Sequence, residues 1–288
     1  MPLGVHTSIA GGLWRSVERA VGLGCDAMQI FGRNPRAWAW SPVPEADAAL
    51  FREKREEALL WPVAIHTTYL INLCAPDDVN FDKSVFLFKK ELGTAERLGA
   101  DYLVTHLGSP GEMGGDFALK RILAALKETA AEGLGKKTRV LLENTAGGGA
   151  RIGSSLPDIG RIIEGASAFG LKTGLCYDTC HGFAAGYDIR TPGDIESLIK
   201  AVNKEIGLKN LRLIHLNDSK GLLNSHLDRH EHIGKGKIGL EGFSLLLNHP
   251  KLAKVPLILE TPKKTEGDDP MNLSTVKKLK GESRFFKP

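Results

Sequence analysis

Short apolar segments recur along the chain, and each is followed by a stretch whose apolar positions repeat at helical spacing. This alternation is typical of strand–helix units that build a parallel sheet. The pattern predicts eight strands, which are Leu3–His6, Ala27–Phe31, Val63–His66, Tyr102–His106, Val140–Glu143, Gly174–Asp178, Leu211–His215 and Val255–Glu260. It predicts helices near residues 12–22, 44–59, 81–98, 115–132, 156–169, 193–206, 240–248 and 272–280.

Eight strand–helix units predict one α/β domain, a TIM (β/α)8 barrel of residues 1–288, because closing the sheet removes both of its exposed edges. A doubly wound open sheet is the alternative that the same pattern allows. Glycines such as Gly99 and Gly170 fall where helices should end, and the sequence contains no linker or low-complexity tract. We expect residues 283–288 to form a poorly ordered tail.

Composition narrows the class of protein further. The net charge of +4 and the pI near 8.8 permit an acidic partner such as DNA, but no cluster of lysines and arginines requires one. Four scattered cysteines are too few for a disulfide framework, which favours a reducing compartment. The N-terminus has no basic and apolar leader, and no apolar stretch approaches the ~18 residues of a membrane span. We therefore expect a cytoplasmic protein without a membrane segment, and a monomer.

The residues that end the predicted strands indicate a function. The third to eighth strands end, in order, on His66, His106, Glu143, Asp178, His215 and Glu260. Every one is a metal-ligand type, and the C-terminal ends of barrel strands converge on one mouth. A lone histidine at a strand end is more often a hydrogen-bonded core residue, but six such ends in succession are hard to explain by folding alone. The sequence therefore predicts a metal cluster at the mouth.

Three further candidates, His181, Asp228 and His230, lie in loops just beyond those ends. In an extended segment Asp228 and His230 leave the same face, since side chains two apart point the same way. Nine ligands suit up to three ions, because catalytic zinc takes about three protein ligands. Imidazoles mixed with carboxylates favour zinc, with manganese as the alternative at one site, over magnesium or calcium.

The remaining histidines and cysteines near these positions are alternatives or packing residues. His226 and His232 share the alternating pattern of Asp228 and are alternative ligands. His6 ends the first strand. It either contacts a metal ligand without binding the metal itself, or packs in the core. Free cysteines are commonly buried as small apolar side chains. The residues expected to have structural roles are His249, Cys176 and Cys180.

A cluster of this composition suits a phosphodiester substrate. Four carboxylates contribute about −4 and three divalent ions about +6, so the filled mouth carries about +2 and attracts an anion. A bound metal lowers the pKa of water to about 7 and holds phosphoryl oxygens. No catalytic triad or dinucleotide-binding motif competes, and the glycine-rich residues 145–149 lack the lysine of a phosphate-binding loop.

Three motifs carry a resemblance to a known family: residues 66–73, residues 174–181, and residues 215–220 together with 228–230. Residues 143–147 and 257–261 add to it. On these motifs the sequence resembles the endonuclease IV family of apurinic/apyrimidinic endonucleases, from the first strand to the last. The resemblance implies a base-excision-repair nuclease with three zinc ions. Such an enzyme cleaves duplex DNA on the 5′ side of abasic sites, leaves a 3′-OH and removes 3′-blocking groups.

The same resemblance implies roles for individual residues. It assigns the first metal to His66, His106 and Glu143, the second to Glu143, Asp178, His215 and Glu260, and the third to His181, Asp228 and His230. Glu143 then bridges two ions and holds the attacking water. By the same resemblance, the side chains that enter the duplex at the lesion are Arg36, Tyr69 and Leu70. Separately from the resemblance, we take Arg33 and Lys220 as candidates for phosphate contact.

Three positions depart from the family pattern, and none of them removes a ligand. Thr68 stands where serine is usual, Tyr177 where an aliphatic residue is expected, and Asn224 where glycine is common. Asn224 is placed to alter the loop that carries the third ligand set.

Two other classes of function remain open on the sequence. A sugar isomerase or epimerase uses a similar barrel, but it generally needs one divalent ion and would not require the motif at residues 228–230. A non-catalytic DNA-binding or scaffold protein is the other class, and for it the substitution Glu143→Gln would leave function unchanged.

Overall fold

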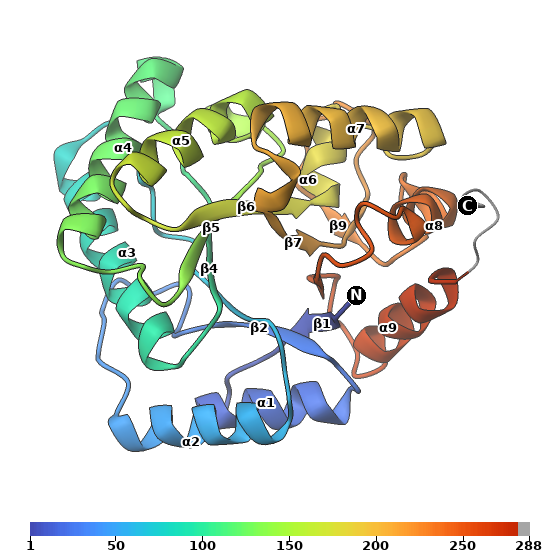
Figure 1. Cartoon of the computed structure of the whole chain (residues 1–288), viewed down its shortest axis with the longest axis horizontal. Coiled ribbons are helices and arrows are strands. Elements are labelled where there is room, and N and C mark those ends of the chain that lie inside the picture. Colours follow the sequence, from blue (N-terminus) through green and yellow to red (C-terminus); the bar gives the residue numbers. More distant parts are fainter. Residues whose placement is uncertain (282–288) are drawn as a thin grey trace.

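Eight parallel strands close into a barrel in the computed structural model, which describes residues 1–281 (Figure 1). The order around the barrel is β1-β2-β3-β4-β5-β6-β7-β10, and β10 closes the ring by pairing with β1. The strands are β1 (Leu3–His6), β2 (Ala27–Phe31), β3 (Val63–His66), β4 (Tyr102–Thr105), β5 (Arg139–Glu143), β6 (Thr173–Asp178), β7 (Leu211–His215) and β10 (Leu257–Leu259). The predicted TIM barrel is confirmed, and the open sheet is wrong.

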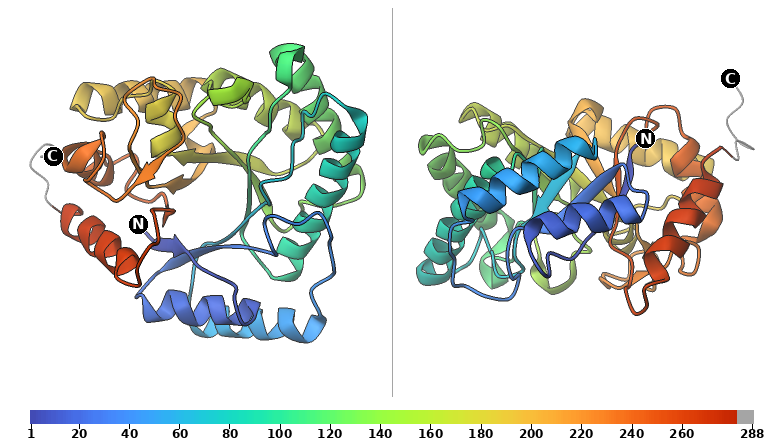
Figure 2. Two further views of the ribbon diagram at one scale, coloured as in Figure 1. Left: turned by 180° about the vertical axis from the view of Figure 1, so that it is seen from behind. Right: turned by 90° about the horizontal axis from the view of Figure 1, so that it is seen from below.

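A ring of helices surrounds the barrel (Figures 1 and 2). The helices that follow the strands are α1 (Leu13–Gly22), α2 (Glu45–Glu57), α3 (Asp78–Arg97), α4 (Gly114–Ala131), α5 (Leu156–Ala168), α7 (Pro192–Glu205), α8 (Gly239–Asn248) and α9 (Asp268–Leu279). All eight predicted helices are present. The helix α3 begins three residues before its predicted start at residue 81, because the Asp77 side chain accepts the Asn80 N–H at 2.9 Å and caps the helix there.

Two small elements were not predicted. The helix α6 (Thr179–Ala184) follows β6 directly, and the Asp178 carboxylate caps it by accepting the His181 N–H at 2.8 Å. A two-stranded antiparallel ribbon joins β8 (Asp218–Ser219) to β9 (His230–Glu231). The helix has six residues and each strand of the ribbon has two, which is too short for a hydrophobic repeat to be recognised in the sequence. Single 3₁₀ turns occupy Gly111–Met113, Gly148–Ala150 and Leu208–Asn210.

Alternation along the strands separates two apolar layers. Eight side chains form a cluster inside the barrel: Ala27, Ala64, Tyr102, Val104, Leu141, Cys176, Leu213 and Ile258. The intervening strand residues face outward and pack under the helices in the larger cluster. Each predicted strand-end ligand lies two positions after a member of the inner cluster, for example Glu143 after Leu141. Strand geometry therefore aims these ligands inward and one layer above the apolar plug.

Two predicted strands end one residue early, which leaves His106 and Glu260 just beyond β4 and β10. At β10 the cause is visible, because the Glu260 N–H donates to the Asn217 side chain at 2.9 Å instead of to a neighbouring strand. His106 and Glu260 still face inward, because each lies two positions after an inward-facing residue, Val104 or Ile258.

Tyr177 faces the outer layer and is buried against α6. A Cβ added at Gly182 of α6 would lie 2.0 Å from the Tyr177 hydroxyl oxygen. The aromatic ring at this position is thus accommodated by a glycine in the helix that crosses it.

Within residues 1–281, no helix is both long and apolar enough to cross a membrane. The tail predicted at residues 283–288 lies outside the described residues.

Candidate metal centre

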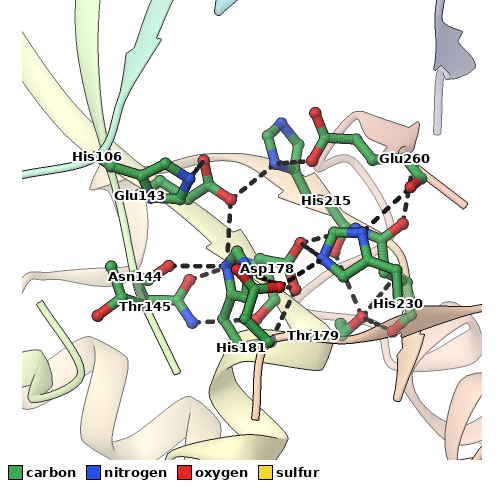
Figure 3. A network of polar contacts seen from close by, with 12 residues as sticks. His106, Glu143, Asn144, Thr145, Asp178, Thr179, His181, His215, His230 and Glu260 are labelled. Carbon is green, nitrogen blue, oxygen red and sulfur yellow. Dashed lines mark hydrogen bonds and ion pairs between the residues drawn. The ribbon is translucent and has the colours of Figure 1, made fainter. Parts of the chain in front are cut away.

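The predicted ligands gather at the mouth formed by the C-terminal ends of the strands (Figure 3). Eight of the nine fall into three groups whose ligand atoms lie within 4.8 Å of one another. The groups are His66, His106 and Glu143; Glu143, Asp178, His215 and Glu260; and Asp178, His181 and His230. The ninth residue, Asp228, lies beside the third group, with Oδ1 3.1 Å from Nε2 of His181.

Glu143 lies at the centre of the arrangement and is completely buried. Its Oε2 is 3.0 Å from Nε2 of His66 and 3.5 Å from Nε2 of His106. Its other oxygen, Oε1, is 3.1 Å from Nδ1 of His215. The two carboxylate oxygens therefore face two different sets of imidazoles, which is the geometry of a bridging ligand.

Asp178 also belongs to two groups, a feature the sequence did not indicate. Its Oδ2 is 3.6 Å from Nε2 of His230, and Asp228 Oδ1 is 3.7 Å from that same nitrogen. Both carboxylates thus face His230, so either can complete the third set with His181.

Backbone carbonyls fix the direction of three imidazole rings. Nδ1 of His66 lies 2.8 Å from the carbonyl oxygen of the next residue, and Nδ1 of His181 lies 3.0 Å from that of Asn144. Nδ1 of His230 lies 3.1 Å from the carbonyl oxygen of Glu260. Because a carbonyl only accepts, each Nδ1 carries the proton, and in the neutral ring Nε2 presents a lone pair to the cluster.

His215 is oriented in the opposite sense by Gln29, a residue that the sequence analysis missed. Nε2 of His215 donates to Oε1 of Gln29 at 2.8 Å, so Nδ1 faces Glu143 and Glu260. The Gln29 amide nitrogen donates to Oε1 of Glu260 at 2.6 Å. A signal was available, since Gln29 is a polar residue two positions after inward-facing Ala27.

His6 contacts a predicted ligand, which decides between its two predicted roles. Its Nδ1 is 3.2 Å from Oε1 of Glu260 and 3.0 Å from the amide nitrogen of Gln29. Burial lowers the pKa of His6, while the Glu260 carboxylate acts in the other direction.

Two asparagines next to the strand ends hold the carboxylates and were also missed. Asn144 accepts the N–H of Asp178 at 2.6 Å and donates to its carbonyl at 3.0 Å. Asn217 donates to Oδ2 of Asp178 at 2.6 Å and accepts the N–H of Glu260. These amides fix both acidic groups in place before any cation arrives.

The loop that carries Asp228 leads into β9, and the chain just after β9 is anchored by a buried acid, Asp218. Its carboxylate accepts backbone N–H groups at 2.8 to 3.4 Å from Ser219, Gly234, Gly236, Ile238 and Gly239. Asn224 in the same loop has φ of 59°, a left-handed conformation that asparagine tolerates, so it can stand where glycine is common.

The other histidines lie outside the three groups. His226 has φ of 55°, which interrupts the predicted alternation, and its Nδ1 donates to the Ala146 carbonyl at 2.9 Å. His232 contacts the Asn272 side chain at 3.0 Å. His249 is buried and lies 2.9 Å from Glu196, so it has a structural role, as predicted.

Cys176 and Cys180 are buried thiols. Burial raises the pKa of each to about 12. Cys176 belongs to the apolar cluster inside the barrel, directly below the ligand layer. The expectation that both cysteines pack agrees with this burial.

Carboxylates and imidazoles shift one another's pKa values strongly. Burial alone would lower the pKa of His66, His181 and His215, but the surrounding acidic groups outweigh it and raise all three. Burial would raise the pKa of Glu143, yet the neighbouring histidines hold it well below the usual value. His106 differs, because burial lowers its pKa to about 4.

These residues fit divalent metal ions. Nε2 of His230 is buried and aimed at Asp178 and Asp228, yet it has no hydrogen-bond partner among the described residues. A cation between these groups would satisfy the nitrogen and neutralise the acids. Mixed imidazole and carboxylate donors are those of zinc and related transition metals.

A pocket of about 870 Å³ lies above the centre. Its lining includes His66, His106, His181 and Glu260, together with Tyr69 and residues 33–35 of the loop after β2. Tyr69 is 64% exposed, Arg36 is exposed near it, and Leu70 is half-buried.

The two candidates for phosphate contact differ in their surroundings. The Arg33 guanidinium donates to the carbonyls of Ala37 and Ala39 and faces Glu91, so protein groups already engage it. Lys220 is half-exposed, and its ammonium lies 3.7 Å from Glu231. Arg33 is therefore a poor candidate, whereas Lys220 stays a prediction.

Comparison with known proteins gives consistent results. Residues 17–286 match a family described as "Xylose isomerase-like TIM barrel". The chain is 41% identical over 277 residues to a protein of Chloroflexus aurantiacus named "Probable endonuclease 4", an alignment that covers 96% of this chain and 97% of that one.

Solved structures agree with this match. Endonuclease IV from Thermus thermophilus superposes with a TM-score of 0.86 at 34% identity, covering 97% of this chain and 98% of that one. A D-tagatose 3-epimerase-like protein superposes with a TM-score of 0.71 at 19% identity, covering 97% of each chain. The second likeness is one of fold alone.

Proposed function

Because this chain belongs to the endonuclease IV family, we propose that it is a DNA-repair endonuclease that hydrolyses the phosphodiester on the 5′ side of abasic sites in duplex DNA. The reaction leaves a 3′-OH, and the same centre removes blocking groups from 3′ ends. One observation carries the proposal: nine acidic and imidazole side chains from separate strands and loops meet beneath an open pocket.

The metals are proposed to be three zinc ions, with manganese as the alternative at one site. The first set is His66, His106 and Glu143, and the second is Glu143, Asp178, His215 and Glu260. The third is His181, Asp228 and His230, with Asp178 close enough to contribute. When bound, the ions supply a hydroxide at neutral pH and positive charge for the phosphoryl oxygens.

The side chains of this protein prepare that chemistry. Glu143 has an oxygen toward each of two ligand sets, so it holds the reacting water between them. Gln29 and the backbone carbonyls orient the imidazoles, which removes the need for reorganisation when DNA binds. The pocket of about 870 Å³ has room for an extruded sugar-phosphate unit.

Recognition of the lesion is proposed for Arg36, Tyr69 and Leu70. Tyr69 lines the pocket, and Arg36 and Leu70 each directly follow a residue that lines it. Arg36 and Tyr69 are exposed and Leu70 is half-buried, which leaves them available to enter a duplex. Side chains inserted in this way fill a gap between stacked bases, and an abasic site already contains such a gap.

The direct test is incision of a duplex with one abasic site by chelated and by zinc-reloaded protein. The reloaded protein should cut on the 5′ side of the lesion and leave a 3′-OH, while the chelated protein should not. An inert reloaded protein with its full metal content would contradict the proposal.

Substituting Glu143→Gln should abolish incision while binding of the abasic duplex is largely retained. We expect a loss of at least about 10³-fold in rate, within the range of about 10²–10⁴ for a positioned base. Rate and binding are measured on the same zinc-loaded sample. An unchanged incision rate would contradict the role proposed for Glu143. A non-catalytic DNA-binding protein would be favoured instead if neither form cut the duplex and the substitution left DNA binding unchanged.

A sugar epimerase is the alternative that the fold permits. Such sites generally need one divalent ion, whereas three ligand groups are present within residues 1–281. Elemental analysis separates the two: about three zinc ions per chain support the nuclease, and one ion with ketose turnover supports the epimerase.

A further inference from the structure

Two loops form one wall of the pocket, and both contact a single buried carboxylate on α3. Residues 33–35 of the first loop line the pocket after β2, and Tyr69 of the second lines it after β3. The carboxylate belongs to Glu91, which is 2% exposed.

Each oxygen of Glu91 faces a different loop. Oε2 accepts the backbone N–H of Thr68, the residue before Tyr69, at 3.0 Å. Oε1 lies 3.5 Å from Nη1 of Arg33. Neither Oε1 nor Nη1 has a hydrogen bond to another group among the described residues, so this ion pair is the polar contact that each has.

Arg33 in turn shapes its own loop. Its Nη2 donates to the carbonyl of Ala37 at 2.6 Å and to that of Ala39, which closes the chain into an arch. Within the arch, the Asn34 side chain accepts the N–H of Arg36 at 3.0 Å. The position of Arg36 therefore depends on the guanidinium that Glu91 holds.

A ring contact adds to this link. The Tyr69 ring packs edge-on against Phe31, the last residue of β2, with ring centres 5.2 Å apart. The loop after β3 is thus held both against the end of β2 and, through Glu91, to the loop that follows it.

We propose that Glu91 is a positioning residue for lesion recognition. By holding Arg33 and the Thr68 N–H with its two oxygens, it sets the distance between the arch that carries Arg36 and the loop that carries Tyr69 and Leu70. This inference rests on the proposed function. The hydrogen bond and the ion pair of Glu91 go to the loops, and its one link to a predicted ligand is a through-space charge interaction with His66, so its main effect is on DNA engagement.

The cost of burying an acid here supports this role. Burial raises the pKa of Glu91 to about 7, against the lowering effects of the Thr68 N–H and Arg33. An apolar side chain at position 91 of α3 could be buried without this desolvation cost. The contacts of the carboxylate with the two loops therefore explain why an acid occupies this position.

The test compares Glu91→Gln with the unsubstituted protein, both zinc-loaded, on an abasic duplex and on bis(p-nitrophenyl) phosphate. The glutamine keeps an acceptor for Thr68 but loses the charge that holds Arg33. We expect KM for the abasic duplex to rise about 10-fold, because misplacing a binding group by ~1 Å costs up to about 10²-fold. Hydrolysis of the small diester and the zinc content should not change. A 2-aminopurine opposite the lesion should give a smaller fluorescence change on binding.

A matched control exists at the other end of β3. Asp101 accepts the N–H of Val63 at 2.8 Å and pairs with Arg55, so it combines the same two contacts far from the pocket. Asp101→Asn should leave KM for the abasic duplex unchanged. A rise equal to that of Glu91→Gln would overturn the inference, because loss of any such pair would then suffice.

A second variant keeps the test decisive if Glu91→Gln does not fold. Arg33→Gln breaks the pair from the partly exposed side and should give the same selective rise in KM. The inference is overturned if the folded variants keep the original KM and fluorescence change, or if both substrates lose activity in parallel. If the unsubstituted protein does not cut the abasic duplex, it is the proposed function that fails.

Discussion

At the scale of single residues, the centre consists of side chains whose direction is already fixed. Three imidazoles are held by backbone carbonyls and a fourth by Gln29, so the nitrogens that face the cluster are determined without a cation. Metal-ligating histidines that are oriented in this way bind more tightly, and loss of the orienting partner typically costs about 10- to 100-fold in affinity.

The pKa shifts predict that zinc binding releases protons at pH 7. His66, His181 and His215 have raised pKa values without metal, since nearby carboxylates outweigh burial. A raised pKa means that the ring holds a proton that zinc must displace, so affinity should increase as the pH rises from about 6 to 8. Calorimetry in buffers of different ionisation enthalpy counts the protons. His232→Gln, outside the three groups, should keep the same count, and a count of zero in the unsubstituted protein would contradict the pKa shifts.

The sequence identified the ligand candidates better than the residues that support them. His66, Glu143 and their counterparts were recognisable because chemically similar residues ended successive strands. Gln29 could be placed inward by its spacing from Ala27, but the sequence carries no signal that its partner is His215, and none that the partners of Asn217 are Asp178 and Glu260. Their contacts depend on the spacing between strands, which only the closed barrel supplies.

At the scale of elements, two short segments shape the site. The helix α6 starts on Asp178 and carries His181, while the β8–β9 ribbon brings His230 to the mouth. Strand alternation was the basis for pairing Asp228 with His230, but only His230 lies in a strand. The backbone turns at His226, so the alternating pattern of an extended segment does not describe this loop.

Substituting Asp218→Asn should weaken the third metal set. The carboxylate faces only N–H donors, so an amide NH₂ group would bring two donors together and release the loop. We expect zinc bound per chain to fall by about one after dialysis against dilute zinc, with affinity for that ion lowered about 10- to 100-fold. Asp188→Asn is the control, because Asp188 also accepts two backbone N–H groups, but near the surface. Full zinc retention in Asp218→Asn would show that the loop needs no such anchor.

Substituting Gly182→Ala should destabilise the packing of α6 on β6. The new Cβ would meet the Tyr177 hydroxyl, and overpacking of this kind costs about 1–3 kcal/mol. Urea unfolding of the zinc-loaded protein measures the change, and Tyr177→Phe should recover part of it in the double variant. Gly115→Ala in α4 meets nothing within 4 Å and should be neutral or slightly stabilising. Equal effects at the two positions would refute the steric explanation.

At the scale of the whole molecule, the repeat of strands and helices was enough to predict a closed barrel. Closure itself could not be seen in any one segment, since it depends on β10 pairing with β1 across the full length of the chain. Once the ring is closed, one rule places the ligands: every second strand residue faces the axis, and the last of these lies at the mouth.

Removing the metals should lower the thermal stability of the entire barrel. The centre joins β3, β5, β6, β7 and the residue after β10, so a bound cation favours the folded ring over the unfolded chain. At a zinc concentration about 100 times the dissociation constant of one site, binding stabilises by ~2.7 kcal/mol. For a domain of this size that corresponds to roughly 4–5 °C in Tm. Calorimetry with chelator, zinc or calcium tests this, and an equal Tm in all three would contradict it.

The order in which ligands occur along the chain has a consequence for synthesis. His66 and His106 leave the ribosome early, but Glu260 follows the final strand, and its ligand set is incomplete until that strand takes its place beside β1. A nascent polypeptide halted before β10 therefore lacks a full set of anchors for the second cation. A nuclease assembled in this order acquires its capacity to cut DNA only after β10 and Glu260 have been synthesised.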